Sequence, residues 1–157
     1  MKKLLVILII GLALRILFNN IEYSSDAYSF IVWSRYLTEH SLTQLYELLP
    51  EGYLPYLPGY YYMLMGIGYL GNIFNIWNHV WLTYLWVKTP VFITDILITI
   101  CIFKFSKLYM SGKNALSGAA FYYLHPAVIY TTSVWGQIDS LLTLEGLAGI
   151  LYWLENK

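Results

Sequence analysis

Charged and hydrogen-bonding side chains occur at a few places inside or beside long apolar segments of this sequence. The most compact group is the polar run WGQIDS at residues 135–140, which separates two apolar stretches. Asp26, Lys88 and Asp95 stand in similar surroundings. An uncompensated carboxylate in hydrocarbon costs several kcal/mol, so such a group either caps a helix at a membrane surface or belongs to a site. These residues are therefore the first candidates for binding or proton-transfer chemistry.

The composition indicates an integral membrane protein. Hydrophobic residues make up 59% of the chain, aromatic residues 18% and charged residues 11%, and the mean hydropathy is +0.57. Nine basic and nine acidic side chains balance, so no basic field indicates nucleic acid and no polybasic run indicates a peripheral membrane protein. The expected partners are membrane lipids and small polar molecules. A lone Cys101 excludes an intrachain disulfide and a cysteine-based metal cluster.

Five apolar segments come close to the length of about 20 residues that a helix needs to cross a bilayer. They lie near residues 4–21, 60–77, 86–105, 115–134 and 139–154. The first resembles a signal peptide, but Arg15 interrupts it and no small-residue cleavage site follows. We therefore expect it to be a retained first span.

The distribution of lysines decides which segments cross. If 60–77 lies along the membrane interface, the basic clusters at 2–3, 104–113 and Lys157 all fall on the cytoplasmic side. Tyrosines and tryptophans crowd that region, and such side chains favour headgroup depth. The prediction is four spans (4–21, 86–105, 115–134 and 139–154), a cytoplasmic N-terminus and one large external loop at 22–84. The alternative is that 60–77 is an ordinary transmembrane helix.

The external loop is expected to contain interfacial helices. Residues from Ala27 to Glu39 are predicted to form a short helix that rests on the membrane, with Asp26 as its N-cap. Prolines and glycines between residues 47 and 59 forbid a continuous helix there. The predicted fold class is thus all-α: a multi-pass transmembrane helical bundle in which residues 1–157 form a single membrane domain.

Several motifs occur in an order that resembles a known family. They are Arg15 in the first span, Asp26 before Trp33, YLPGY at 56–60, KTP at 88–90 followed by Asp95, and His125-Pro126 leading into the run at 135–140. In this order they resemble the N-terminal part of GT-C-fold glycosyltransferases that use lipid-phosphate-linked sugars. The similarity is greatest to bacterial and archaeal multi-pass mannosyltransferases related to the enzyme that adds the second mannose of GPI anchors. Protein O-mannosyltransferases are more distant, and the resemblance covers nearly the whole chain.

The resemblance implies a hexosyltransferase that moves a sugar from polyprenyl or dolichyl monophosphate to an acceptor hydroxyl with inversion, on the external or lumenal face. Asp26 matches the family's catalytic acid near the start of the first external loop, and a carboxylate is the natural base for the hydroxyl proton. No cofactor is implied. We expect no divalent metal, since only Glu22 lies near Asp26 in sequence. Enzymes of this family have many more spans, so we expect an N-terminal fragment that is inactive alone.

Two cationic residues are expected inside or at the end of spans. Lys88 is placed at the external end of its helix, with Pro90 in the first turn, where the ammonium would stabilise the phosphate that leaves with the lipid. The simpler alternative is that Lys88 reaches out to lipid headgroups. Arg15 and Asp95 lie at similar depths, roughly 10 Å from the external ends, which predicts an intramembrane ion pair. His125 is expected to mark a structural kink.

The run at 135–140 has a structural and a binding interpretation. In the first, Gly136 turns the chain and Asp139 or Ser140 caps the next helix. Gln137 has no role in such a turn, whereas Gln and Trp together suit sugars through hydrogen bonds and ring stacking. The candidate residues for substrate and lipid-phosphate binding are therefore Tyr60, Lys88, Trp135, Gln137 and Asp139.

A non-catalytic alternative is a membrane scaffold or transporter segment. In that hypothesis an ion path would be lined by Arg15, Lys88, Asp95 and Glu145, and these side chains would converge on a cavity at the midplane. Glu145 is predicted to be buried. The transferase hypothesis instead gathers Asp26, Lys88 and residues 135–140 at one membrane face.

Overall fold

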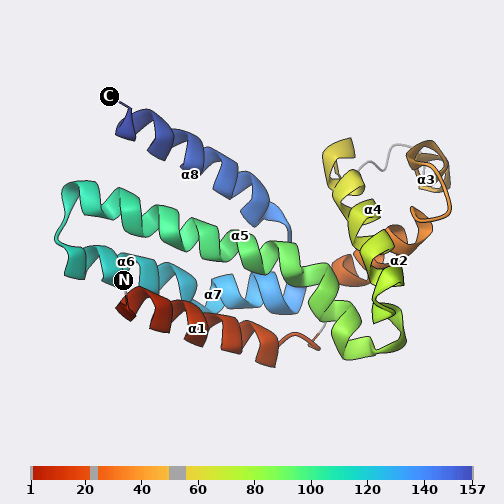
Figure 1. Cartoon of the computed structure of the whole chain (residues 1–157), viewed down its shortest axis with the longest axis horizontal. Coiled ribbons are helices and arrows are strands. Elements are labelled where there is room, and N and C mark those ends of the chain that lie inside the picture. Colours follow the sequence, from red (N-terminus) through yellow and green to blue (C-terminus); the bar gives the residue numbers. More distant parts are fainter. Residues whose placement is uncertain (1, 22–24, 50–55, 157) are drawn as a thin grey trace. The chain divides into compact units, whose positions relative to one another are not determined.

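The structure, a computed structural model, describes residues 2–21, 25–49 and 56–156, and this part of the chain is all-α (Figure 1). The α-helices are α1 (Lys2–Leu17), α2 (Asp26–Tyr36), α3 (Leu42–Leu48), α4 (Pro58–Ile73), α5 (Val80–Tyr109), α6 (Gly112–Tyr123), α7 (Pro126–Ile129) and α8 (Asp139–Glu155). A 3-10 turn (Ile76–Asn78) precedes α5, and a π-helical segment (Tyr130–Trp135) follows α7. Glu22, residues 50–55 and Lys157, on which parts of the sequence argument depend, lie outside the described residues.

The chain divides into two compact units, one of residues 25–87 and one of residues 1–24 with 88–157. In the first unit α2 packs against α4. The two helices approach so closely at Gly68 that a Cβ at this position would overlap the backbone carbonyl of Ser34. A cluster of aromatic rings fills this unit: Phe30, Trp33, Tyr56, Tyr60 and Tyr61. The helix predicted from Ala27 to Glu39 is present as the shorter α2, while its place on a membrane surface stays a prediction. Helix α4 begins at Pro58, and the first turn is where proline is best tolerated.

In the second unit α1 packs against α6 and α7. Gly11 of α1 lies directly against α6, since a Cβ there would overlap the Tyr123 ring. The predicted span at 115–134 is not one continuous helix. His125 takes an extended backbone before Pro126, and its Nδ1 accepts the Ala127 N–H at 3.2 Å as the N-cap of α7. The kink predicted at this position is therefore present.

Two predicted helix starts are wrong. The N-cap of α2 is Ser25 rather than Asp26, which is the first helical residue, where its carboxylate favourably meets the helix dipole. The long helix α5 starts at Val80, so Pro90 lies inside it instead of in its first turn. The apolar residues that precede Pro90 continue the helix pattern, and the helix runs through Pro90 although proline removes one backbone hydrogen bond and crowds the preceding turn. Helix α8 starts at Asp139, where the last span was predicted to start, and its N-cap is Ile138, so the interpretation in which Asp139 or Ser140 caps this helix is wrong.

One helix of the described residues, α5, is both long and apolar enough to cross a membrane. Helices of this length and composition also occur in the cores of soluble proteins and as signal sequences. The helices α1 and α8 are shorter, with 16 and 17 residues. The all-α class is thus established.

Candidate functional site

Arg15 of α1 and Asp95 of α5 form a buried ion pair. Arg15 Nη2 and Nε lie 2.8 Å and 2.9 Å from Asp95 Oδ2, and both side chains are 0% exposed. Two N–H groups that donate to one carboxylate oxygen make a charge-assisted contact, which is stronger than one between neutral groups. The structure thus brings together the two residues that the depth argument paired.

The other polar atoms of this pair find partners on α1 and α6. Arg15 Nη1 donates to the carbonyl oxygens of Gly11 at 3.0 Å and Tyr123 at 3.1 Å. The Tyr122 hydroxyl donates to Asp95 Oδ1 at 3.2 Å, and the guanidinium lies 4.1 Å from the centre of the Tyr123 ring. Such additional partners are what a buried ion pair needs to offset the loss of hydration. The pair ties α1, α5 and α6 together, and sequence patterns indicated neither the tyrosines nor Gly11 as its partners.

Lys88 lies two helical turns before Asp95 in α5 and is 2% exposed. Its Nζ donates to the backbone carbonyl of Asn19 at 2.8 Å and to that of Ser133 at 2.5 Å. The alternative in which this lysine reaches lipid headgroups is therefore wrong. Its ammonium instead connects the segment after α1 to the π-helical segment.

An apolar cavity of about 550 Å³ lies beside this π-helical segment. Its walls come from the end of α1 and from residues 124–134, among them Leu14, Phe18, Ile21, Pro126, Ile129 and Val134. The neighbouring Ser133 hydroxyl is buried and makes no hydrogen bond within the described part of the chain. One short segment therefore combines an apolar cavity, a carbonyl that binds a lysine ammonium and an unsatisfied hydroxyl. π-Helical insertions are frequent at functional sites.

Gly136 ends the π-helical segment with a left-handed backbone, φ 82° and ψ 23°, which glycine adopts without a steric penalty. The N–H groups of Gly136 and Gln137 both donate to the Thr131 carbonyl at 3.0 Å. The turn predicted at Gly136 is thus present. The next helix is held to α5 by a hydrogen bond of 2.9 Å between the hydroxyls of Ser140 and Thr94.

The other polar residues of the 135–140 run are accessible to different degrees. Trp135 is 37% exposed, and its ring centre lies 6.4 Å from that of Tyr130. Gln137 is half-buried, and Asp139 is exposed at the start of α8. An exposed indole followed by an amide and a carboxylate is an arrangement that can stack on a sugar ring and bond its hydroxyls. Sugar binding by these three residues stays a prediction.

Asp26 and Tyr60 belong to the unit of residues 25–87. Both are half-buried, and the Tyr60 ring centre lies 5.1 Å from that of Phe30. Burial raises the pKa of Tyr60 above its usual value, and the charges of Tyr56, Tyr61 and Asp26 raise that pKa further. A tyrosine hydroxyl is protonated at neutral pH even at its usual pKa, so Tyr60 is a hydrogen-bond donor there, and the Asp26 carboxylate contributes to the further rise of this pKa. These two candidate residues share one neighbourhood.

The residues of the ion-path alternative are arranged differently from what that hypothesis requires. Glu145 is exposed on α8, so its predicted burial is wrong. Among the described side chains of α8 only Leu151 is buried, so the packing described for this helix does not enclose Glu145. Arg15 and Asp95 bond to each other rather than facing an open lumen.

No group of three or more His, Cys, Asp or Glu side chains that could hold a metal ion occurs among the residues with described positions. The functional features that the sequence did not indicate are the carbonyl partners of Lys88 and the cavity beside residues 124–134. No periodicity or motif marks them, because they depend on the positions of segments far apart in the chain. No protein-family model, no curated protein and no solved structure matches this chain.

Proposed function

We propose that this chain is part of a multi-pass membrane glycosyltransferase that moves a sugar from a lipid-phosphate carrier to an acceptor hydroxyl. Asp26 acts as the base that removes the hydroxyl proton, and the sugar is transferred with inversion at C1. Tyr60, Lys88, Trp135, Gln137 and Asp139 bind the donor. Mannose is the sugar that the family resemblance favours.

The observation that carries the membrane part of this proposal is the distribution of buried and exposed side chains in the unit of residues 1–24 and 88–157. Its fully buried side chains include Arg15, Asp95 and Thr99. Large apolar side chains are instead exposed along its helices, among them Leu5, Ile9, Ile93, Leu97, Leu142 and Ile150. Soluble proteins bury charged groups rarely, whereas helices in a bilayer turn them inward and face lipid with apolar groups. This pattern supports α1, α5 and α8 and the broken α6–α7 segment as membrane-embedded elements.

The cavity beside residues 124–134 supports a lipid-linked donor. A polyprenyl or dolichyl chain is apolar, so it suits walls made of Leu14, Phe18 and Val134. Ser133 precedes the lining residue Val134 in the sequence; its hydroxyl is buried without a hydrogen bond among the described residues, and its carbonyl accepts a hydrogen bond from the Lys88 ammonium. A phosphate oxygen accepts hydrogen bonds from a serine hydroxyl and from a lysine ammonium. In this proposal the apolar lipid chain occupies the cavity. The Lys88 ammonium is buried between the Asn19 and Ser133 carbonyls, so it meets the lipid phosphate only when one of these segments moves.

The proposed role of Asp26 is tested by Asp26→Asn in the complete protein, which removes the base and keeps the size of the side chain. Transfer is measured as release of polyprenyl phosphate from polyprenyl-phosphate mannose in membranes, by mass spectrometry. We expect a loss of at least about 100-fold, since general base catalysis typically contributes 10²- to 10⁴-fold. Glu39→Gln is the matched control, because Glu39 is an exposed carboxylate of the same unit. Near-normal turnover by Asp26→Asn at equal expression would refute the assignment.

A further inference from the structure

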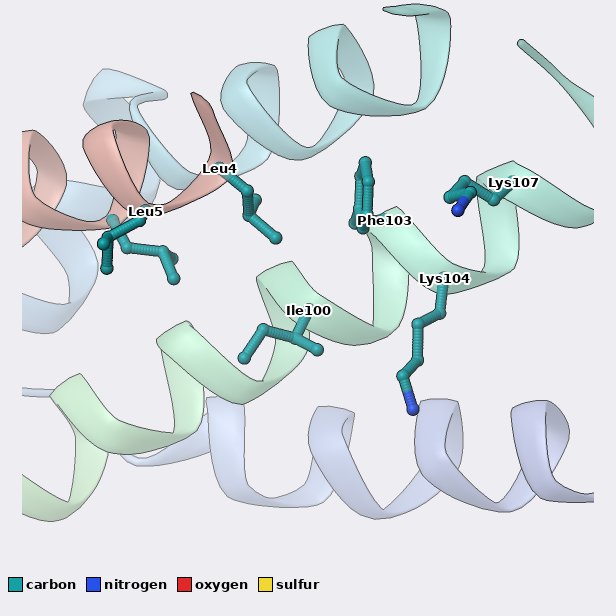
Figure 2. Close-up of a pocket in the computed structure, with 7 residues that line it drawn as sticks. Leu4, Leu5, Ile100, Phe103, Lys104 and Lys107 are labelled. Atoms are coloured by element: carbon teal, nitrogen blue, oxygen red, sulfur yellow. The ribbon is translucent and has the colours of Figure 1, made fainter. Parts of the chain in front are cut away.

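Two adjoining cavities lie where α1, α5 and α6 come together near the start of α1 and the end of α5. The first, of about 350 Å³, is lined by Lys3, Lys107 and Lys113 together with Leu4, Phe103 and Leu116. The second, of about 430 Å³, is lined mainly by Leu4, Leu5, Leu8, Ile100 and Phe103 (Figure 2). Leu4, Phe103 and Lys107 belong to both linings, so an apolar groove continues into a basic cavity.

The basic cavity gathers positive charge from three helices. Lys3 lies in the first turn of α1, Lys107 in the last turn of α5 and Lys113 in the first turn of α6. None of the described residues that line either cavity is acidic. The positive end of the α6 dipole adds to this field beside Lys113. Three like charges around one cavity repel one another, and an anion bound among them relieves that repulsion.

The neighbouring lysine on α5 is placed differently. Figure 2 shows Phe103 and Lys107 close to each other on α5, while the amine of Lys104 extends away from them. The Lys107 Nζ lies 5.7 Å from the centre of the Phe103 ring. Lys104 lines the apolar groove but not the basic cavity. The two lysines are therefore a matched pair, with equal charge on the same helix but only one of them at the cavity.

We infer that this surface is a binding site for a membrane phospholipid with a net negative headgroup. The headgroup phosphate lies among Lys3, Lys107 and Lys113, and an acyl chain follows the groove along Leu4 and Ile100. Basic cavities between helices at a membrane face bind anionic headgroups in this way. The inference rests on the membrane embedding proposed above. It uses none of the residues assigned to the sugar donor.

The test uses the purified protein in neutral detergent, titrated with phosphatidylglycerol, phosphatidylcholine or inorganic phosphate, with binding followed by native mass spectrometry. We expect phosphatidylglycerol to bind at least tenfold more tightly than either of the other probes. Lys107→Gln should weaken phosphatidylglycerol binding about fivefold, and the triple Lys3→Gln, Lys107→Gln, Lys113→Gln variant about 100-fold, since each lysine near a headgroup contributes about 1 kcal/mol. Lys104→Gln should change it less than twofold, and Lys107→Arg should retain it.

Several results would overturn the site. Equal losses from Lys104→Gln and Lys107→Gln would mean diffuse attraction, and equal binding of inorganic phosphate would mean an anion site that takes no lipid. If the unmodified protein were a dimer and the triple variant a monomer with the same lipid preference, a second copy of the chain rather than a lipid would cover the groove. Carbonate extraction of membranes separates the two proposals: a protein that stays in the membrane yet shows no preference for phosphatidylglycerol refutes this inference alone, and a protein released by carbonate refutes the embedding. Circular dichroism confirms that each variant is folded.

Discussion

Among single residues, Arg15 and Asp95 depend on each other most, because both are fully buried and each offsets the charge of the other. A charge in an apolar segment costs free energy unless an opposite charge offsets its loss of hydration. Arg15 and Asp95 lie at similar depths in separate apolar segments, so their pairing could be predicted from position alone. Their neighbours could not. The carbonyl groups of Gly11 and Tyr123 carry no sequence signal, because every residue has a carbonyl.

The pair is expected to respond to mutation in a non-additive way. Arg15→Leu and Asp95→Leu each leave one buried charge uncompensated, which should lower the free energy of unfolding by about 3–5 kcal/mol. The double variant removes both charges, so it should be more stable than either single variant. Unfolding in detergent, followed by circular dichroism, gives the coupling energy. Glu145→Leu is a control at an exposed charge, and simple additivity of the two single effects would contradict the proposed role of the contact.

Gly11 provides a second prediction at this scale. Gly11→Ala places a methyl group against the Tyr123 ring, so α1 and α6 must separate or the ring must move. We expect a loss of about 1–3 kcal/mol in the free energy of unfolding, as for other overpacked interiors. Gly149→Ala is the matched control, because a Cβ at Gly149 of α8 meets open space. If both variants unfolded at the same temperature, the close approach at Gly11 would not limit stability.

At the scale of elements, the sequence located the helices better than their ends. Composition and proline placement were sufficient to predict the helix that follows Asp26 and the break at His125. The start of α5 was misplaced because Pro90 suggested a first turn, whereas the helix begins at Val80, six residues before the predicted start at residue 86. A helix end is decided by small differences between adjacent caps, and these differences depend on tertiary packing.

The π-helical segment gives a prediction that belongs to this scale. It ends at Gly136, whose left-handed backbone disfavours a side chain. Gly136→Ala should lower the free energy of unfolding by about 1–2 kcal/mol, while Gly136→Asn should be better tolerated, since asparagine visits this conformation more readily. Thermal unfolding of the two variants in detergent measures the difference. Gly146→Ala, at a helical position with open space, serves as the control, and equal effects of Ala and Asn would speak against backbone strain.

At the scale of the whole molecule, the two units bear on different parts of the proposed reaction. Asp26 and Tyr60 share a neighbourhood within residues 25–87. The features that suit a lipid phosphate, which are Lys88, Ser133 and the apolar cavity, all belong to the other unit. The candidate residues could be chosen from the sequence because their types and order carry the family resemblance. The groups that surround each candidate residue could not be predicted, because they come from distant parts of the chain. The Asn19 carbonyl that binds Lys88, for example, is 69 residues away in the sequence.

The buried pair of Arg15 and Asp95 also has a consequence for biogenesis. In the membrane proposed for this chain, α1 leaves the ribosome with an arginine whose carboxylate partner is 80 residues from being made. Arg15 lies in the last turn of α1, and a charged side chain held inside hydrocarbon without a partner is costly. If the proposed embedding holds, the Arg15 charge gains its carboxylate partner only after α5 has been made, so we expect α1 to reach its final position in the bilayer no earlier than α5 does.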